Sequence, residues 1–77
     1  MADEKLRAVA IAVLTDYMGI AAEFVVDDAF EEVKKYPAFS TTPETRAMYF
    51  YVCLGKQLPA GIPYFKIKEA IVKAMAA

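Results

Sequence analysis

Apolar residues recur at helical spacing in the first part of this 77-residue chain. Successive apolar positions lie three or four residues apart, as one face of a helix with a period of 3.6 residues requires. The alternative, a strand over residues 9–14, lacks turn-forming residues at its flanks. The pattern therefore predicts a helix over residues 3–18. Its apolar face comprises Leu6, Val9, Ala10, Val13, Leu14 and Tyr17.

Gly19 interrupts the longest apolar region of the chain. A glycine at this point can adopt a positive φ and cap a helix, whereas inside a helix it costs about 1 kcal/mol relative to alanine. We therefore predict a structural bend at Gly19 and a second helix over residues 20–35, which Pro37 follows. The predicted core face of this helix is Ala21, Phe24, Val25, Ala29 and Val33, with Phe30 to one side.

Two signals mark the start of a third helix. Thr41 followed by Glu44 forms a capping box, whereas Thr42 as the N-cap places Pro43 at the favoured first helical position. The sequence leaves both starts open. Residues 48–54 are all apolar, which also fits a buried strand, but the capped start and Gly55 as a C-cap favour a helix over residues 43–54. Such a helix is apolar nearly all round, so it is either central or shared with a partner.

A fourth helix is predicted over residues 63–76, with Pro63 in its first turn. Its apolar face comprises Tyr64, Ile67, Ala70, Ile71, Ala74 and Met75, with Phe65 beside it. Together the four segments predict an all-α fold. They form a single small helical domain over residues 1–77, built as a compact four-helix bundle.

The composition argues against catalysis and against a metal centre. The chain has no histidine and a single cysteine, Cys53, so a Cys/His metal site and an internal disulfide are both excluded within one chain. Cys53 lies in an apolar run, which is typical of a small buried hydrophobe. We predict no catalytic residue, no cofactor and no metal ligand. A lone cysteine also favours a reducing, cytoplasmic location.

Charge is unevenly distributed along the chain. Residues 1–32 contain eight acids and two bases, and residues 33–77 contain seven bases and two acids. This asymmetry predicts either attraction within one fold or opposite faces that steer partners and stack subunits head to tail. Three lysines without arginine in the last helix disfavour nucleic acid and membrane surfaces as partners. Arg7, Asp16 and Glu23 argue against a membrane span over residues 6–26.

The bend at Gly19 carries a resemblance to a known family. Its front is Tyr17-Met18-Gly19, and its back is Ala22 with Val25-Val26. These residues resemble the aromatic-apolar-Gly-Pro-Ile-Ala motif and the following Leu-Val pair of a small helical C-terminal domain. That domain is appended to bacterial signalling proteins such as adenylate cyclases and serine/threonine kinases.

The resemblance extends beyond the motif. Leu58-Pro59 and Phe65 resemble the family's connector into its last helix, so the similarity covers most of the chain from around Leu6. Ile20 stands where the family has proline, and Ala21 stands where it has isoleucine. The resemblance implies an all-helical accessory or interaction module, and it implies no catalytic residues.

Apolar residues make up 58% of the chain, more than a core of this size requires. A surplus of this kind indicates surface reserved for a partner. The leading prediction is therefore a non-catalytic protein–protein interaction or regulatory module, with self-association as a homodimer among its forms. Aromatic residues dominate interface energetics, so the candidate interface residues are Phe30, Tyr49, Tyr51 and Tyr64. The alternative function is a small helical binder of an apolar small molecule or lipid.

Overall fold

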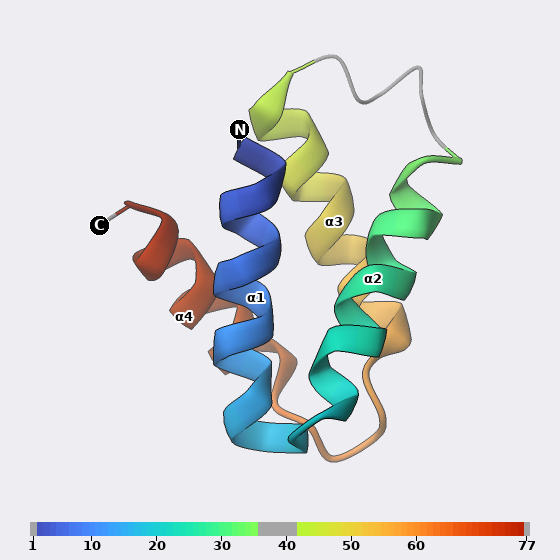
Figure 1. Ribbon diagram of the computed structural model, residues 1–77, viewed down its shortest axis with the longest axis vertical. Coiled ribbons are helices and arrows are strands. Elements are labelled where there is room, and N and C mark those ends of the chain that lie inside the picture. The colour runs from blue at the N-terminus through green and yellow to red at the C-terminus, as the bar shows by residue number, and fades with distance from the viewer. Residues whose placement is uncertain (1, 36–41, 77) are drawn as a thin grey trace.

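The computed structural model describes residues 2–35 and 42–76 of the chain. These residues form four α-helices: α1 (Ala2–Met18), α2 (Ala21–Val33), α3 (Pro43–Gln57) and α4 (Tyr64–Ala76) (Figure 1). No strand occurs in this part of the chain, so the predicted all-α, four-helix fold class is confirmed.

The helices pack so that α2 contacts both α1 and α3, while α1 also packs against α4. In Figure 1, α1 and α2 lie in front, and α3 and α4 lie behind them and diverge toward the top of the view. The Nζ atom of Lys5 donates a hydrogen bond to the backbone oxygen of Met75 at 3.3 Å, which joins the start of α1 to the end of α4. None of the described helices is long and apolar enough to cross a membrane.

The core draws side chains from all four helices. Phe50 is the largest fully buried side chain of the described residues, and its ring stacks on that of Phe30 with 4.4 Å between centroids. Cys53 is buried, as its apolar surroundings in the sequence predicted. The buried hydrophobic residues are Leu6, Ala10, Leu14, Ala22, Val26, Ala29, Val33, Phe50, Cys53, Leu54, Ile67 and Ile71.

Local signals explain two of the helix boundaries. Gly19 lies between α1 and α2 with φ 60°, a conformation that glycine adopts without the steric cost of a Cβ. At the start of α3, Thr42 is the N-cap, and its side-chain oxygen accepts a hydrogen bond from the backbone N–H of Thr45 at 3.1 Å. Pro43 therefore occupies the first helical position. Thr41, the other candidate cap, lies outside the described residues.

The prediction that Gly55 ends the third helix is wrong. α3 continues to Gln57, and its C-cap is Leu58, which has extended backbone angles (φ −74°, ψ 135°). Leu58 precedes Pro59, and the residue before a proline is disfavoured in the helical region, so the proline ends the helix. Gly55 has a different role inside α3. A Cβ at this position would lie 3.1 Å from ring atom Cε1 of Tyr64, so the glycine lets α4 approach closely.

The predicted core face of the second helix is also corrected. Ala29 and Val33 of the predicted face are buried, but Phe24 is 70% exposed, and Ala22 and Val26 are fully buried in its place. Small buried residues suit α2 because it packs between two neighbours. The helix ends at Val33, and Lys34 and Lys35 form a turn instead of its last residues. Tyr17 and Ala70, which the patterns placed on core faces, are exposed as well.

Candidate interaction surface

Large hydrophobic side chains remain on the surface after the core is formed. They come from the α1–α2 corner, from the outer side of α2, and from the outer sides of α3 and α4. Burying such side chains elsewhere releases water from apolar surface, which favours association. Those that the structure describes as exposed are Tyr17, Ile20, Phe24, Met48, Val52, Phe65 and Val72.

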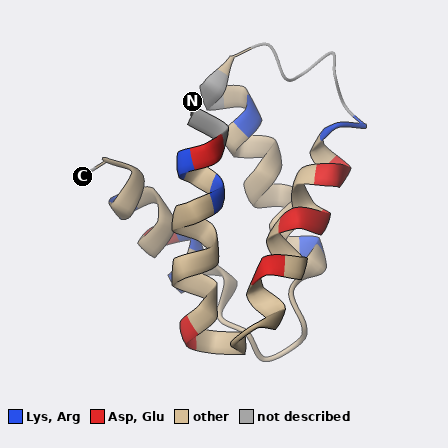
Figure 2. Cartoon of the chain, in the orientation of Figure 1, with Lys and Arg blue, Asp and Glu red and all other residues tan. Residues whose placement is uncertain are grey.

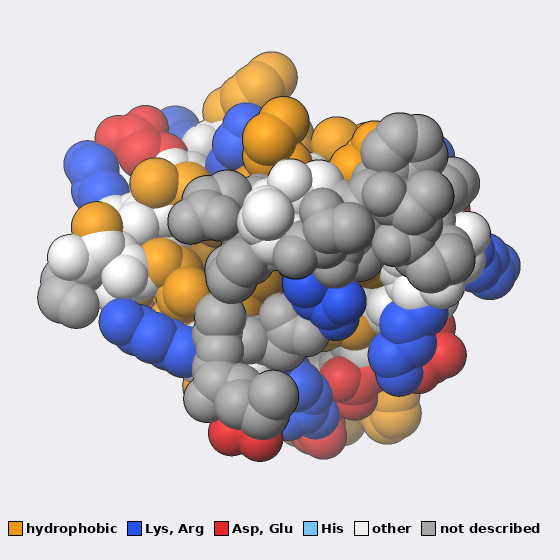
Figure 3. Space-filling model, turned by 90° about the horizontal axis from the view of Figure 1, so that it is seen from above, with side chains coloured by type: hydrophobic (Ala, Val, Ile, Leu, Met, Phe, Trp, Pro, Cys, Tyr) orange, Lys and Arg blue, Asp and Glu red, His pale blue; other side chains and the backbone are white. Residues whose placement is uncertain are grey.

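Two helices contribute to the first surface. Met48 and Val52 lie four residues apart on one side of α3, and Phe65 and Val72 lie seven apart on one side of α4. Phe65 is 80% exposed and Met48 is 68% exposed. We call these four residues the α3–α4 surface. Figure 3 shows hydrophobic atoms gathered along the upper edge of its view, on the side that lies behind α1 in Figure 1, with basic atoms among them.

Direct contacts beside the α3–α4 surface join its two helices. The Tyr64 hydroxyl donates a hydrogen bond to the backbone oxygen of Tyr51 at 2.8 Å, and the Nζ atom of Lys68 lies 5.8 Å from the centroid of the Tyr51 ring. The rings of Tyr64 and Phe65 meet edge to face at 5.4 Å. Tyr51 and Tyr64 are both half-buried. The surface is therefore held in place before any partner binds.

The structure separates the four candidate interface residues of the sequence. Tyr51 and Tyr64 lie beside the α3–α4 surface, whereas Phe30 stacks on Phe50 in the core. Tyr49 is half-buried and packs against the core. The aromatic criterion missed Met48 and Val52 because neither residue is aromatic. The signal that could have found them was the apolar run over residues 48–54, since a helix buries only part of its circumference against one core.

The second surface lies on the outside of α2. Ile20, Phe24 and Asp28 follow one another at intervals of four residues, and Glu31 lies in the next turn. We call these four residues the α2 surface. Ile20 is 91% exposed, and Asp28 and Glu31 are exposed as well. α2 contains five acids and no base, and Figure 2 shows the acidic residues along its length.

Ion pairs within the chain involve only some of its charges. The Nε atom of Arg7 lies 2.8 Å from Asp27, and the guanidinium also contacts Glu23 at 3.3 Å. The hydrogen bond from Arg7 lowers the pKa of the Asp27 carboxyl from its ordinary value. These contacts join α1 to α2.

Other charges form no ion pair with the residues that the structure describes. Lys73 pairs with Glu69 at 2.9 Å, but Lys66 and Lys68 form no ion pair with any described residue. Asp28 on the α2 surface likewise forms none. The α2 surface and the helix that carries Lys66 and Lys68 therefore present unpaired charges of opposite sign.

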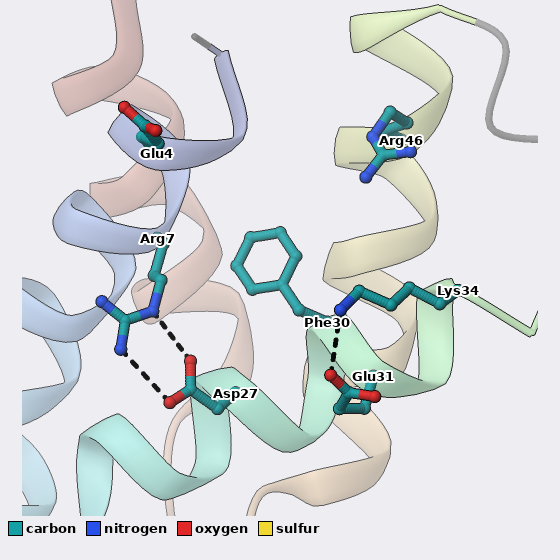
Figure 4. Close-up of a pocket in the computed structure, with 7 residues that line it drawn as sticks. All are labelled: Glu4, Arg7, Asp27, Phe30, Glu31, Lys34 and Arg46. Atoms are coloured by element: carbon teal, nitrogen blue, oxygen red, sulfur yellow. Dashed lines mark hydrogen bonds and ion pairs between the residues drawn. The ribbon is translucent and has the colours of Figure 1, made fainter.

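A pocket of about 430 Å³ opens between the start of α1, the end of α2 and the start of α3. Figure 4 shows the Phe30 ring between Arg7 and Arg46, and the Arg7–Asp27 and Lys34–Glu31 ion pairs at its sides. This charged lining differs from the apolar enclosure that a lipid site requires. Within the described ranges, no group of three or more Cys, Asp or Glu side chains is placed to hold a metal ion.

The Tyr64 hydroxyl gives this region a pH dependence. Burial raises the pKa of the Tyr64 phenol, because the folded state favours its neutral form. The contribution of this neutral phenol to the free energy of unfolding is fully present below the ordinary tyrosine pKa of about 10. It is lost as the pH rises through the raised pKa of the folded state. Tyr64→Phe is expected to lower the free energy of unfolding by about 1 kcal/mol at neutral pH, because it removes the hydrogen bond to Tyr51.

Above about pH 10, the Tyr64→Phe chain should lose stability less steeply than the parent chain. Urea unfolding followed by circular dichroism at neutral and alkaline pH measures both effects. Tyr17→Phe is the matched control, since Tyr17 is exposed. If the free energy of unfolding falls equally steeply with pH in the parent chain and in the Tyr64→Phe variant above about pH 10, the pH dependence does not come from Tyr64.

The fold and its surfaces define a class of protein: a small four-helix domain with two exposed apolar surfaces that differ in charge. No protein-family model matches the chain, and neither a curated protein nor a solved structure matches it. The function therefore has to follow from the two surfaces and the side chains around them.

Proposed function

We propose that this chain is a non-catalytic protein–protein interaction or regulatory module that binds its partner through the α3–α4 surface. The observation that carries the proposal is the exposure of four large hydrophobic side chains beside Tyr51 and Tyr64. Contiguous apolar surface on a small folded domain marks interaction sites, and each Å² buried contributes about 25 cal/mol.

The chemistry of the α3–α4 surface suits a protein partner. Phe65 offers a large, exposed aromatic side chain of the kind that anchors interfaces, and Met48 offers a flexible side chain that adapts to a partner's shape. The hydrogen bond between Tyr64 and Tyr51 fixes the helices on which these side chains stand. A surface fixed in this way loses less conformational entropy on binding.

The proposal extends to a regulatory role in the bacterial cytoplasm. The resemblance of residues around Gly19 to accessory domains of bacterial signalling proteins supports such a role. Burial raises the pKa of the Cys53 thiol, which keeps the thiol protonated and weakly reactive, as expected of a structural cysteine. A protein with one buried cysteine suits a reducing compartment.

Site-specific photo-cross-linking in cells of the native host tests the proposal. A photoreactive phenylalanine analogue replaces Phe65 in one variant and Met48 in a second, and Ala12, exposed on α1, in a matched control. We expect a discrete protein adduct from the first two variants and none from the control. Folded variants that give no adduct at either position would rule out the α3–α4 surface as a binding site. The adduct's mass also distinguishes a second copy from a different protein.

A further inference from the structure

We infer that the partner of the α3–α4 surface is a second copy of this chain, which docks its α2 surface there. The inference rests on the proposed function and names the partner. In this arrangement each subunit presents its α2 surface to one neighbour and its α3–α4 surface to another. The two contacting patches are different, so the contact is heterologous rather than two-fold symmetric.

Both surfaces expose apolar side chains that can pack against each other. Ile20 and Phe24 project from one side of a helix at i and i+4, the spacing by which a helix presents anchors to an apolar surface. On the receiving side, Met48 comes from α3 and Phe65 comes from α4. The α2 surface thus supplies one exposed helical stripe, and the α3–α4 surface supplies exposed apolar side chains from two helices on which that stripe packs.

The charges of the two surfaces are complementary. α2 contains five acids and no base, whereas residues 43–76, from the start of α3 to the end of α4, contain five bases and two acids. One of these acids, Glu69, already pairs with Lys73, while Lys68, which lies over the Tyr51 ring, forms no ion pair with the described residues. Asp28 on the α2 surface also forms none. Docking one surface on the other gives these charges partners of opposite sign, which fixes orientation and speeds encounter.

The same charges oppose the symmetric alternatives. Two α2 surfaces face to face would bring Asp28, which forms no ion pair with the described residues, against its own copy. Two α3–α4 surfaces face to face would bring Lys68 near its copy. Like charges placed opposite one another across an interface are destabilising, so the head-to-tail contact is favoured. A contact of this type leaves a free surface at each end, and the assembly therefore grows with protein concentration unless it closes into a ring.

Light scattering behind a sizing column tests the inference with two single variants that each block one surface. Phe24→Ser alters only the α2 surface, and Phe65→Ser alters only the α3–α4 surface. Both side chains are exposed, so neither change removes a core contact. Ala12→Ser, exposed on α1, is the matched control. Circular dichroism verifies that all three variants fold.

We expect the molar mass of the parent chain and of Ala12→Ser to rise with concentration, and each single variant alone to associate at least about tenfold more weakly. An equimolar mixture of the two single variants should form a heterodimer and nothing larger. In this mixture, one chain retains an intact α2 surface and the other an intact α3–α4 surface. The parent chain's association should weaken several-fold as NaCl rises from about 50 to about 500 mM, because salt screens the exposed charges.

Two results would overturn the inference. The first is a parent chain that stays monomeric at every concentration. The second is a mixture of Phe24→Ser and Phe65→Ser that stays monomeric while the parent associates, since a symmetric contact is not restored by mixing. Neither result removes the proposed function, which fails only when photo-cross-linking at Phe65 and Met48 captures no protein. An adduct with a different protein would keep the function and exclude the second copy as partner.

Discussion

Replacing Phe50 by alanine is expected to lower the free energy of unfolding by about 3–5 kcal/mol. Phe50 is fully buried, and its ring stacks on that of Phe30 at 4.4 Å with 24° between the ring planes. Its ring also meets that of Tyr51 at 5.9 Å. A domain of this length is stabilised by only about 5–10 kcal/mol in total. The Phe50→Ala chain should therefore lose at least about a third of its stability.

Urea unfolding followed by far-ultraviolet circular dichroism measures the effect of Phe50→Ala. The matched control is Phe65→Ala, which removes the same side chain from a position that is 80% exposed. The control should change the free energy of unfolding by less than about 0.5 kcal/mol. Comparable losses in the two variants would mean that Phe65 belongs to the core, and would contradict the α3–α4 surface as described.

Much of the fold could be predicted from local signals in the sequence. The helical spacing of apolar residues predicted four helices, and the structure has four in its described part. Gly19 and Pro43 act within a few residues of their own positions, through a positive φ and a fixed φ respectively, so they are readable without tertiary information. Pro59 after Leu58 is a local signal for the end of α3, but Gly55, which is also a stop signal, predicts an earlier end.

The full core face of α2 could not be predicted in the same way. Its sequence contains the doublets Ala21-Ala22 and Val25-Val26, so two adjacent apolar stripes are available. The stripe that includes Phe24 has the larger side chains, which favoured it as the core face. The structure keeps Ala29 and Val33 buried, as predicted. It buries Ala22 and Val26 instead of Phe24, because α2 lies against both α1 and α3, where small residues allow close approach. That choice depends on neighbours remote in sequence.

The candidate surface depended on tertiary information still more strongly. The sequence indicated that the third helix is apolar nearly all round, and therefore that part of it is left for a partner. It could not indicate which part, because all seven residues of the run are apolar, and the direction in which each one faces depends on the fold. Nor could it bring Phe65 next to α3, since that proximity arises from the contact between Tyr64 and Tyr51.

Gly55→Val is expected to lower the free energy of unfolding by about 2 kcal/mol, because it overpacks the contact between α3 and α4. A Cβ at residue 55 would lie 3.1 Å from Cε1 of Tyr64 and 3.4 Å from two further atoms of the same ring. The ring has little freedom to move aside, since its hydroxyl is bonded to the backbone oxygen of Tyr51 at 2.8 Å. Valine adds two methyl groups beyond the Cβ, so Tyr64 must leave its position.

The displacement of Tyr64 has its own signature. The pKa of its phenol, which burial raises in the parent chain, should fall back toward the ordinary value, and a spectrophotometric titration of the tyrosines follows that change. Gly55→Ala is the graded control, because about 1 kcal/mol of helix propensity offsets the milder crowding. Ala12→Val, at an exposed position of α1, measures how much a valine in a helix changes the free energy of unfolding without any crowding. Parent-like stability and an unchanged Tyr64 titration in Gly55→Val would show that the position of α4 does not depend on a glycine at residue 55. If the expected loss of stability is observed, partner binding should weaken as well, because Phe65 and Val72 lie on the displaced helix.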